Sequence, residues 1–192
     1  EVVYVELDEA HCSLQNKKNV VANLALVHTG HSIGTFASKR KELENKHYFG
    51  DLNADTSSFC DRIYDYIQKR YRLKDLKYIF VSGDGASWIN SFTNKLRNCF
   101  KTTHIKIIQV LDKFHFRKRL TSIFSGNKKI INMIISELNS LNPEMFTFIA
   151  NDFYDKNPNH KCNPNQFRKH VNYICNNFKY IKNNLHPKYK TP

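Results

Sequence analysis

The sequence lacks the features that mark membrane and secreted proteins. In its 192 residues no apolar run approaches the ~18 residues that a membrane-spanning helix needs. No charged, apolar and small-residue leader opens the chain, so we expect no export and a cytoplasmic location. The chain begins with Glu1 rather than Met, which we interpret as processing or as an internal piece of a longer protein.

Cysteine is scarce and poorly arranged for cross-linking. The five cysteines are odd in number and contain no C-x-x-C pair, so we expect reduced thiols rather than a disulfide framework. Two of them lie near histidines, in the order His160, Cys162, His170 and Cys175. The spacings H-x-C and H-x₄-C do not match the common Cys₂His₂ form, so we do not expect zinc.

Acidic residues are outnumbered, 17 against 30 Lys and Arg, which gives a net charge of +13. A basic excess of this size favours a polyanionic partner, most often a nucleic acid. The charge is uneven, because residues 1–112 carry a net +3 and residues 113–192 a net +10. We therefore expect a near-neutral globular part followed by a basic one.

Hydrophobic patterning in the first part predicts an α/β fold. Strands are expected over 2–7, 19–28, 46–50, 76–82 and 105–111, and helices over about 56–72 and 88–100. The order β-β-β-α-β-α-β is that of the ribonuclease H-like folds, with a five-stranded mixed sheet. Beyond it we predict a mainly helical segment that adds no strand, exposes apolar surface and frays over 187–192.

Two aspartates follow strands that this order makes neighbours. Asp8 is expected to end the first strand, and Asp84, in Ser82-Gly83-Asp84-Gly85, to follow the fourth. Two carboxylates held together repel unless a cation neutralises them, and Mg²⁺ or Mn²⁺ prefers oxygen ligands. We predict that the two carboxylates lie within about 8 Å of each other and hold a metal pair. Taken singly, each Asp is better interpreted as a turn or cap residue, and only the strand order that brings the two together favours the metal pair.

Further polar residues lie near the same expected edge of the sheet. Asp112 and His115 form a D-x-x-H directly after the fifth strand, and His11 lies three residues beyond Asp8. We treat all three as accessory candidates, with helix capping by Asp112 as the alternative.

Four segments, taken in order, resemble a known family. VYVELDEAHCSLQ, RKELENKHYFG, VSGDGASWI and VLDKFHF are similar to the ISLre-type insertion-sequence transposases of low-GC bacteria. The resemblance implies a bacterial DDE transposase with a ribonuclease H-like core, in which Asp8 and Asp84 are the first two acids. Asp112 and His115 would correspond to the C/D-x-x-H signature of Mutator-like relatives.

The resemblance also implies what is missing. In the family a helical insertion follows the fifth strand, and a glutamate beyond it completes the triad. On this reading residues 1–115 are an incomplete catalytic core and residues 116–192 a basic helical insertion segment. The chain would be a transposase fragment truncated at both ends, with Glu137 and Glu144 as surface residues rather than the third acid.

The candidate DNA contacts are Arg117, Lys118 and Arg119. They would contact DNA phosphates if the active site lies where Asp8 and Asp84 are expected to meet. A solvated helix face explains these three residues equally well. Trp88 either stacks on a base or, as we prefer, anchors a helix to the sheet.

The expected function is thus Mg²⁺- or Mn²⁺-dependent cleavage of DNA at transposon ends and strand transfer to target DNA, with homo-oligomerisation in the full-length protein. Three alternatives stay open. One is a ribonuclease H-like nuclease unconnected with transposition, and another is a non-catalytic nucleic-acid-binding module. The third is a decayed gene fragment.

Overall fold

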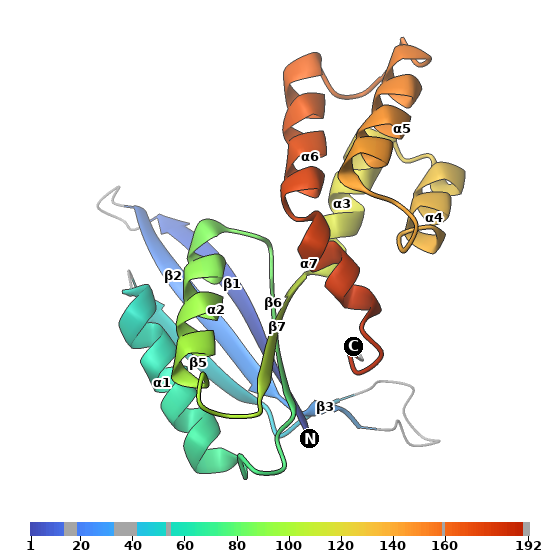
Figure 1. The fold of residues 1–192 in the computed structure, drawn as a ribbon. Coiled ribbons are helices and arrows are strands. Elements are labelled where there is room, and N and C mark those ends of the chain that lie inside the picture. The colour runs from blue at the N-terminus through green and yellow to red at the C-terminus, as the bar shows by residue number, and fades with distance from the viewer. Residues whose placement is uncertain (14–18, 33–41, 53–54, 159, 190–192) are drawn as a thin grey trace. The chain divides into compact units, whose positions relative to one another are not determined.

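The computed structural model describes residues 1–13, 19–32, 42–52, 55–158 and 160–189. The chain forms two compact units (Figure 1). Unit 1 comprises residues 1–110 together with the C-terminal residues from 187, and unit 2 comprises residues 111–186. The sequence placed a boundary five residues later, between positions 115 and 116.

The first unit is built on a mixed sheet. The strands are β1 (Val2–Ser13), β2 (Asn19–His28), β3 (Gly30–His31), β4 (Leu43–Glu44), β5 (His47–Leu52), β6 (Tyr78–Gly83) and β7 (Lys106–Leu111). Five of them form one sheet in the order β5-β2-β1-β6-β7, and β3 and β4 pair separately. β1 pairs antiparallel with β2 and parallel with β6, and β2 pairs antiparallel with β5. The predicted α/β fold with a ribonuclease H-like layout is confirmed.

β1 is longer than the sequence predicted. We expected the strand to stop at Asp8, but it continues to Ser13 because ten residue pairs join it to β2, from Tyr4↔His28 to Ser13↔Asn19. Its parallel ladder with β6 is shorter and ends at Glu6↔Ser82. Asp8 therefore lies inside an antiparallel hairpin, past the end of the parallel ladder.

The two faces of the sheet have different coverings. Val3, Val5 and Leu7 of β1 pack into a core with helices α1 (Thr56–Arg70) and α2 (Ser87–Cys99). Tyr4 points to the opposite face, where it clusters with Phe80, Val110 and Tyr189. Tyr189 is buried there, so the prediction that the C-terminal residues are frayed is wrong at this position. Residues 190–192 lie outside the described residues.

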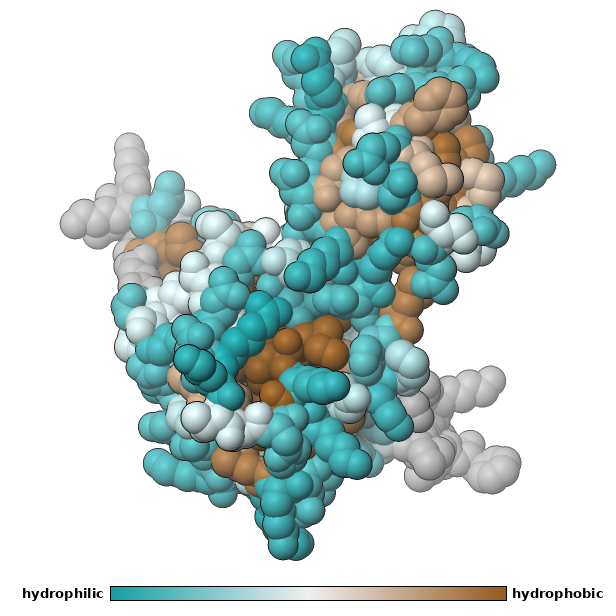
Figure 2. All heavy atoms as spheres, viewed as in Figure 1, coloured by the Kyte–Doolittle hydropathy of each residue, from teal (hydrophilic) through white to brown (hydrophobic). Residues whose placement is uncertain are grey.

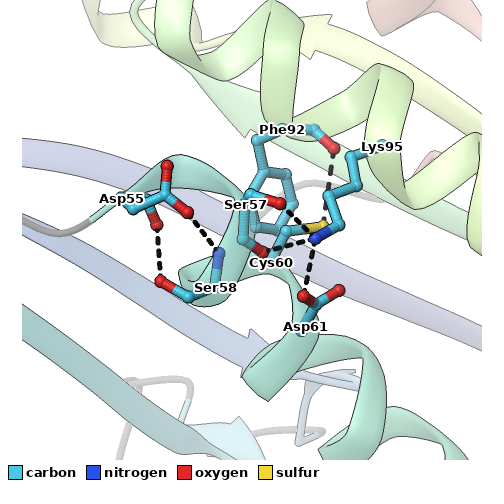
Figure 3. Close-up of polar contacts among 7 residues, drawn as sticks. All are labelled: Asp55, Ser57, Ser58, Cys60, Asp61, Phe92 and Lys95. Atoms are coloured by element: carbon cyan, nitrogen blue, oxygen red, sulfur yellow. Dashed lines mark hydrogen bonds and ion pairs between the residues drawn. The ribbon is translucent and has the colours of Figure 1, made fainter.

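Polar contacts hold α2 against α1 (Figure 3). Lys95 of α2 donates to the backbone oxygen of Ser57 at 2.8 Å and forms an ion pair with Asp61 at 2.6 Å. The N-cap of α1 is Asp55, whose side chain accepts a hydrogen bond from Ser58 N. Deeper between the helices, the Cys60 thiol donates to the carbonyl of Phe92.

The second unit is helical, as predicted. It contains α3 (Lys113–Ile123), α4 (Lys128–Ser136), α5 (Pro143–Asp155), α6 (Pro164–Asn176), α7 (Phe178–Lys182) and a 3₁₀ turn, Asn183–Leu185. Asparagines at 127, 142 and 163 cap α4, α5 and α6 through their side-chain oxygens, because each accepts a backbone N–H of the first turn. No strand occurs among the described residues of 116–189.

Both units present apolar as well as polar surface on the side drawn in Figure 2. In unit 2 the large exposed apolar side chains are Phe114, Met133, Met145, Phe148 and Leu185. The predicted exposure of apolar surface on the helical segment is therefore confirmed. Within the described ranges, none of the helices has the length and apolar character that crossing a membrane requires.

Candidate functional site

The turn between β6 and α2 depends on two glycines. A Cβ on Gly83 would collide with the end of the Ile89 side chain and lie 3.1 Å from the carbonyl oxygen of Leu7, so any other residue would force Ile89 and the β1 backbone to shift. Gly85 has φ +83°, a conformation that side chains disfavour. The two glycines fix the path of the backbone on either side of Asp84.

Asp8 and Asp84 occupy corresponding positions on neighbouring strands. The last pair of the parallel ladder is Glu6↔Ser82, and each aspartate comes two residues after its member of that pair. Neighbouring strands lie about 4.8 Å apart, and residues two apart point to the same face. Asp8 thus lies on the face away from α1 and α2, whereas Asp84 is one residue past the end of β6, in the turn that leads to α2.

Both carboxylates already accept backbone hydrogen bonds. Asp8 Oδ1 accepts from Glu9 N at 2.9 Å, and Asp84 Oδ1 accepts from Ala86 N at 2.9 Å. The second bond is a local turn contact just ahead of α2, so the capping interpretation of Asp84 holds as well. Asp8 is exposed and Asp84 is half-buried.

The structure adds a carboxylate that sequence reasoning missed. Glu6 precedes Asp8 by two residues and so shares its face. Its Oε1 lies 3.4 Å from Nε2 of His28, which is fully buried and stacked on Tyr4 at 5.0 Å between ring centroids. The period-2 alternation of the strand was the available signal, since it already put Glu6 and Asp8 on one side.

His11 does not share that face. It lies three residues from Asp8 on the same strand, so the pleat turns it to the other side. Its side chain is exposed, and Nε2 lies 3.3 Å from Glu9 Oε1.

Asp112 and His115 form a local pair in unit 2. One oxygen of Asp112 accepts from Phe114 N at 2.9 Å and caps α3, and the other lies 2.9 Å from His115 Nδ1. The D-x-x-H spacing is one helical turn, which is why the two side chains meet. The pair fixes the start of α3 and the orientation of the imidazole ring.

The three basic residues of α3 that were expected to contact DNA differ in exposure and in their partners. Arg117 and Lys118 are exposed on α3. The Arg119 guanidinium turns to α6, where it lies 3.1 Å from His170 Nδ1 and 4.7 Å from the ring centroid of Tyr173. Burial and the charge of Arg119 lower the pKa of His170. Arg119 therefore joins α3 to α6 rather than presenting its charge in the way that Arg117 and Lys118 do.

Trp88 is at the start of α2, partly buried against the core of unit 1. Its indole Nε1 is buried, with no hydrogen-bond partner in the portion of the chain that the structure describes. This position matches the anchoring role more closely than base stacking.

No group of three or more His, Cys, Asp or Glu side chains capable of holding a metal occurs among the described residues. Two of the four residues considered for zinc have other partners. His160 Nε2 lies 2.6 Å from the carbonyl of Ile123, whereas Cys175 Sγ lies 3.3 Å from Thr147 Oγ1. Asp8 and Asp84 supply oxygen donors of the kind that Mg²⁺ and Mn²⁺ bind, but only two of them.

Residues 1–187 match a family described as "Uncharacterised protein family (UPF0236)". Three UPF0236 proteins of Caldanaerobacter subterraneus subsp. tengcongensis are each 25 % identical to the chain over 181 residues, or 94 % of its length. The chain spans only 34 to 36 % of the length of these relatives. No solved structure is significantly similar to the chain.

Proposed function

The chain belongs to the uncharacterised protein family UPF0236, and from this premise we propose that it is part of a DDE-type transposase. The activity proposed for the whole protein is metal-dependent cleavage of DNA at the ends of an insertion sequence, followed by strand transfer. The DNA ends and the target DNA are the proposed partners, and Mg²⁺ or Mn²⁺ is the proposed cofactor.

One observation carries this proposal. Asp8 and Asp84 follow the last pair of the parallel β1–β6 ladder by the same two residues, where β6 ends and β1 continues only as a partner of β2. Open α/β sheets bind their ligands beyond the carboxyl ends of parallel strands, and the parallel ladder ends at this point. Gly83, which directly precedes Asp84, supports the same reading, because it lies close to the Leu7 carbonyl of β1.

The repetition of the relatives within one genome is a second support. One of the related UPF0236 proteins carries a name that joins eleven locus designations of a single strain, and another name joins four. A gene copied many times within one genome is what an insertion sequence produces when it transposes.

The residues of the chain would act mainly by binding and positioning. A divalent ion at this edge would activate the attacking oxygen and stabilise the leaving one. Asp8 and Asp84 would bind that ion through their carboxylates. Glu6, held by buried His28, would add negative charge on the same face. The attacking water or 3′-hydroxyl needs no covalent intermediate with the protein, so positioning and charge neutralisation would carry the catalysis.

Metal binding provides the direct test. Isothermal titration of the 192-residue chain with Mn²⁺ should detect a site that weakens at least about tenfold in Asp8→Asn and in Asp84→Asn, because loss of even an outer partner costs 10–100-fold. Asp61→Asn is the matched control, since Asp61 is an exposed aspartate paired with Lys95 on the other side of the sheet. Equal Mn²⁺ affinity in all four proteins would overturn the proposal.

The genomic DNA around the coding region tests the transposition part separately. The proposal expects an open reading frame that extends past this chain to a glutamate motif, flanked by terminal inverted repeats. A metal-binding chain with neither feature would favour the ribonuclease H-like nuclease instead.

A further inference from the structure

The exposed face of α3 combines an aromatic ring with basic side chains. Lys113, Phe114, Arg117, Lys118 and Thr121 are all exposed, at the i, i+1, i+4, i+5 and i+8 positions of one helical stripe. Phe114 is 66 % exposed, an unusual position for a phenylalanine in the first turn of a helix that has its own buried side. The buried side consists of Phe116, Leu120 and Ile123, which pack into the core of unit 2.

The Phe114 ring is held in place by its neighbours. His115 packs against it edge to face, at 5.4 Å between ring centroids and 84° between ring planes, and Asp112 fixes the imidazole through Nδ1. Lys118 Nζ lies 5.9 Å from the centroid of the Phe114 ring. An aromatic ring ordered in this way beside a cation can accept a stacked base without first losing conformational freedom.

The cations on this face crowd one another. Arg117 follows Lys113 by four residues on α3, so the two cations are neighbours on one face, and burial and then the charge of Arg117 lower the pKa of Lys113. Like charges held together on a surface favour a polyanion, because its phosphates relieve the repulsion. Only four acidic residues occur in positions 113–192, against fourteen basic ones.

A second exposed phenylalanine shows that exposure alone does not make such a site. Phe148 of α5 is 73 % exposed, but the residues four before and four after it on the helix are Glu144 and Asp152. The residues three and four after Phe114 are Arg117 and Lys118. Only the Phe114 face has the charge that complements a phosphate backbone.

From these contacts we infer that the α3 face binds DNA with unpaired bases: Lys113, Arg117 and Lys118 contact the phosphates, and Phe114 stacks on one base. Bases are inaccessible for stacking inside an intact duplex, whereas every unpaired base offers a flat face. The choice of DNA as the polyanion rests on the proposed function. The preference for unpaired bases rests on Phe114.

Fluorescence anisotropy of the 192-residue chain with labelled oligonucleotides, in EDTA, tests this inference. Phe114→Ala should weaken single-stranded DNA binding by about fivefold or more, which is the lower range for one base–aromatic contact, and change duplex binding by less than about twofold. Phe148→Ala should change neither affinity. The double variant Arg117→Ala and Lys118→Ala should weaken both, and reduce the salt slope for duplex by about 2.

A second readout separates stacking from a structural role for Phe114. In a single strand that carries 2-aminopurine, the chain should quench the fluorescence of the analogue, and Phe114→Trp should keep the quenching while Phe114→Leu loses it. Circular dichroism should show the same helix content in all variants. Equal single-strand affinity and quenching in Phe114→Leu, Phe148→Ala and the unmodified chain would overturn the inference.

These measurements contain no metal, so they do not depend on Asp8 or Asp84. If Phe114 recognises unpaired DNA but no Mn²⁺ site exists at the aspartates, the catalytic proposal alone fails. If Mn²⁺ binds and Phe114 contributes nothing to DNA binding, the inference about α3 alone fails.

Discussion

Asp8 and Asp84 each lie two residues beyond their member of the Glu6↔Ser82 pair, where the parallel ladder between β1 and β6 ends. Past this pair β1 continues only as a partner of β2, while β6 turns into α2 through two glycines. The parallel pairing of the two strands therefore ends just before the aspartates. The proposed metal site depends on this arrangement, and the separation of the two carboxylates stays a prediction.

The 192-residue chain should bind DNA but cleave it poorly. Because residues 113–192 carry a net +10, the affinity should fall steeply with salt, with a slope of about 0.9 for each phosphate contacted on duplex. If the third carboxylate of the proposed triad lies outside these residues, the geometry at the scissile phosphate loosens, and a misplacement of ~1 Å can cost on the order of 10²-fold in rate. Fluorescence anisotropy at several salt concentrations measures the binding, and a strand-cleavage assay with Mn²⁺ measures the cleavage.

Robust cleavage by this chain would contradict that prediction, and two variants would then locate the missing acid. Loss of cleavage in Glu6→Gln would assign it to the same face of the sheet as Asp8. Loss in Glu137→Gln would assign it to unit 2 instead.

Replacing Gly83 with Ala should destabilise unit 1 by about 1–3 kcal/mol, the usual cost of overpacking. The new methyl group would meet the Ile89 side chain and the carbonyl of Leu7 at 3.1 Å. Gly50→Ala is the matched control, because its Cβ would lie 3.6 Å from Leu24, an ordinary contact. Urea unfolding followed by the fluorescence of Trp88 gives both free energies, and an equal loss in the two variants would disprove the close approach at Gly83.

The Cys60 thiol should resist alkylation in the folded protein. Burial, and then the nearby Cys99, raise its pKa to about 12, so the reactive thiolate is negligible near neutral pH. Iodoacetamide followed by peptide mass spectrometry should modify Cys60 only after unfolding, and the half-buried Cys162 should be modified sooner. Rapid modification of Cys60 in the native chain would mean that α1 and α2 are not packed as described.

The stability of unit 2 should fall in mild acid because of His170. Its pKa is lowered in the fold by burial and by Arg119, so the unfolded chain takes up a proton first as the pH falls. The contribution of His170 to the stability of unit 2 is therefore complete above the ordinary histidine pKa, about 6.5. It is lost as the pH falls from there through the lower pKa that His170 has in the folded protein.

Hydrogen-exchange protection of α3 and α6, corrected for intrinsic rates, at about pH 7.5 and pH 5.5 measures this effect. His170→Gln should show a smaller difference between the two pH values than the unmodified chain. The same difference in both proteins would assign the acid sensitivity to other groups.

The local elements of this protein follow from the sequence alone. The strand Asn19–His28 was predicted at its observed bounds, and the other strands of the sheet except β1 within two residues at each end, because alternation of apolar residues is a local signal. The helical character of unit 2 follows equally from its apolar stripes. The four short segments on which the resemblance to transposases rests lie within residues 1–187, which match the uncharacterised family, and the transposase assignment itself stays a proposal.

Tertiary structure alone decided which side chains have partners. The sequence treated Arg117, Lys118 and Arg119 as one group, but packing of α3 on α6 turned Arg119 to His170 and Tyr173 and left the other two exposed. Pairing with β2 carried β1 past Asp8. Periodicity and capping involve neighbours within a few residues, whereas these outcomes depend on contacts between segments far apart in the chain, which no local pattern encodes.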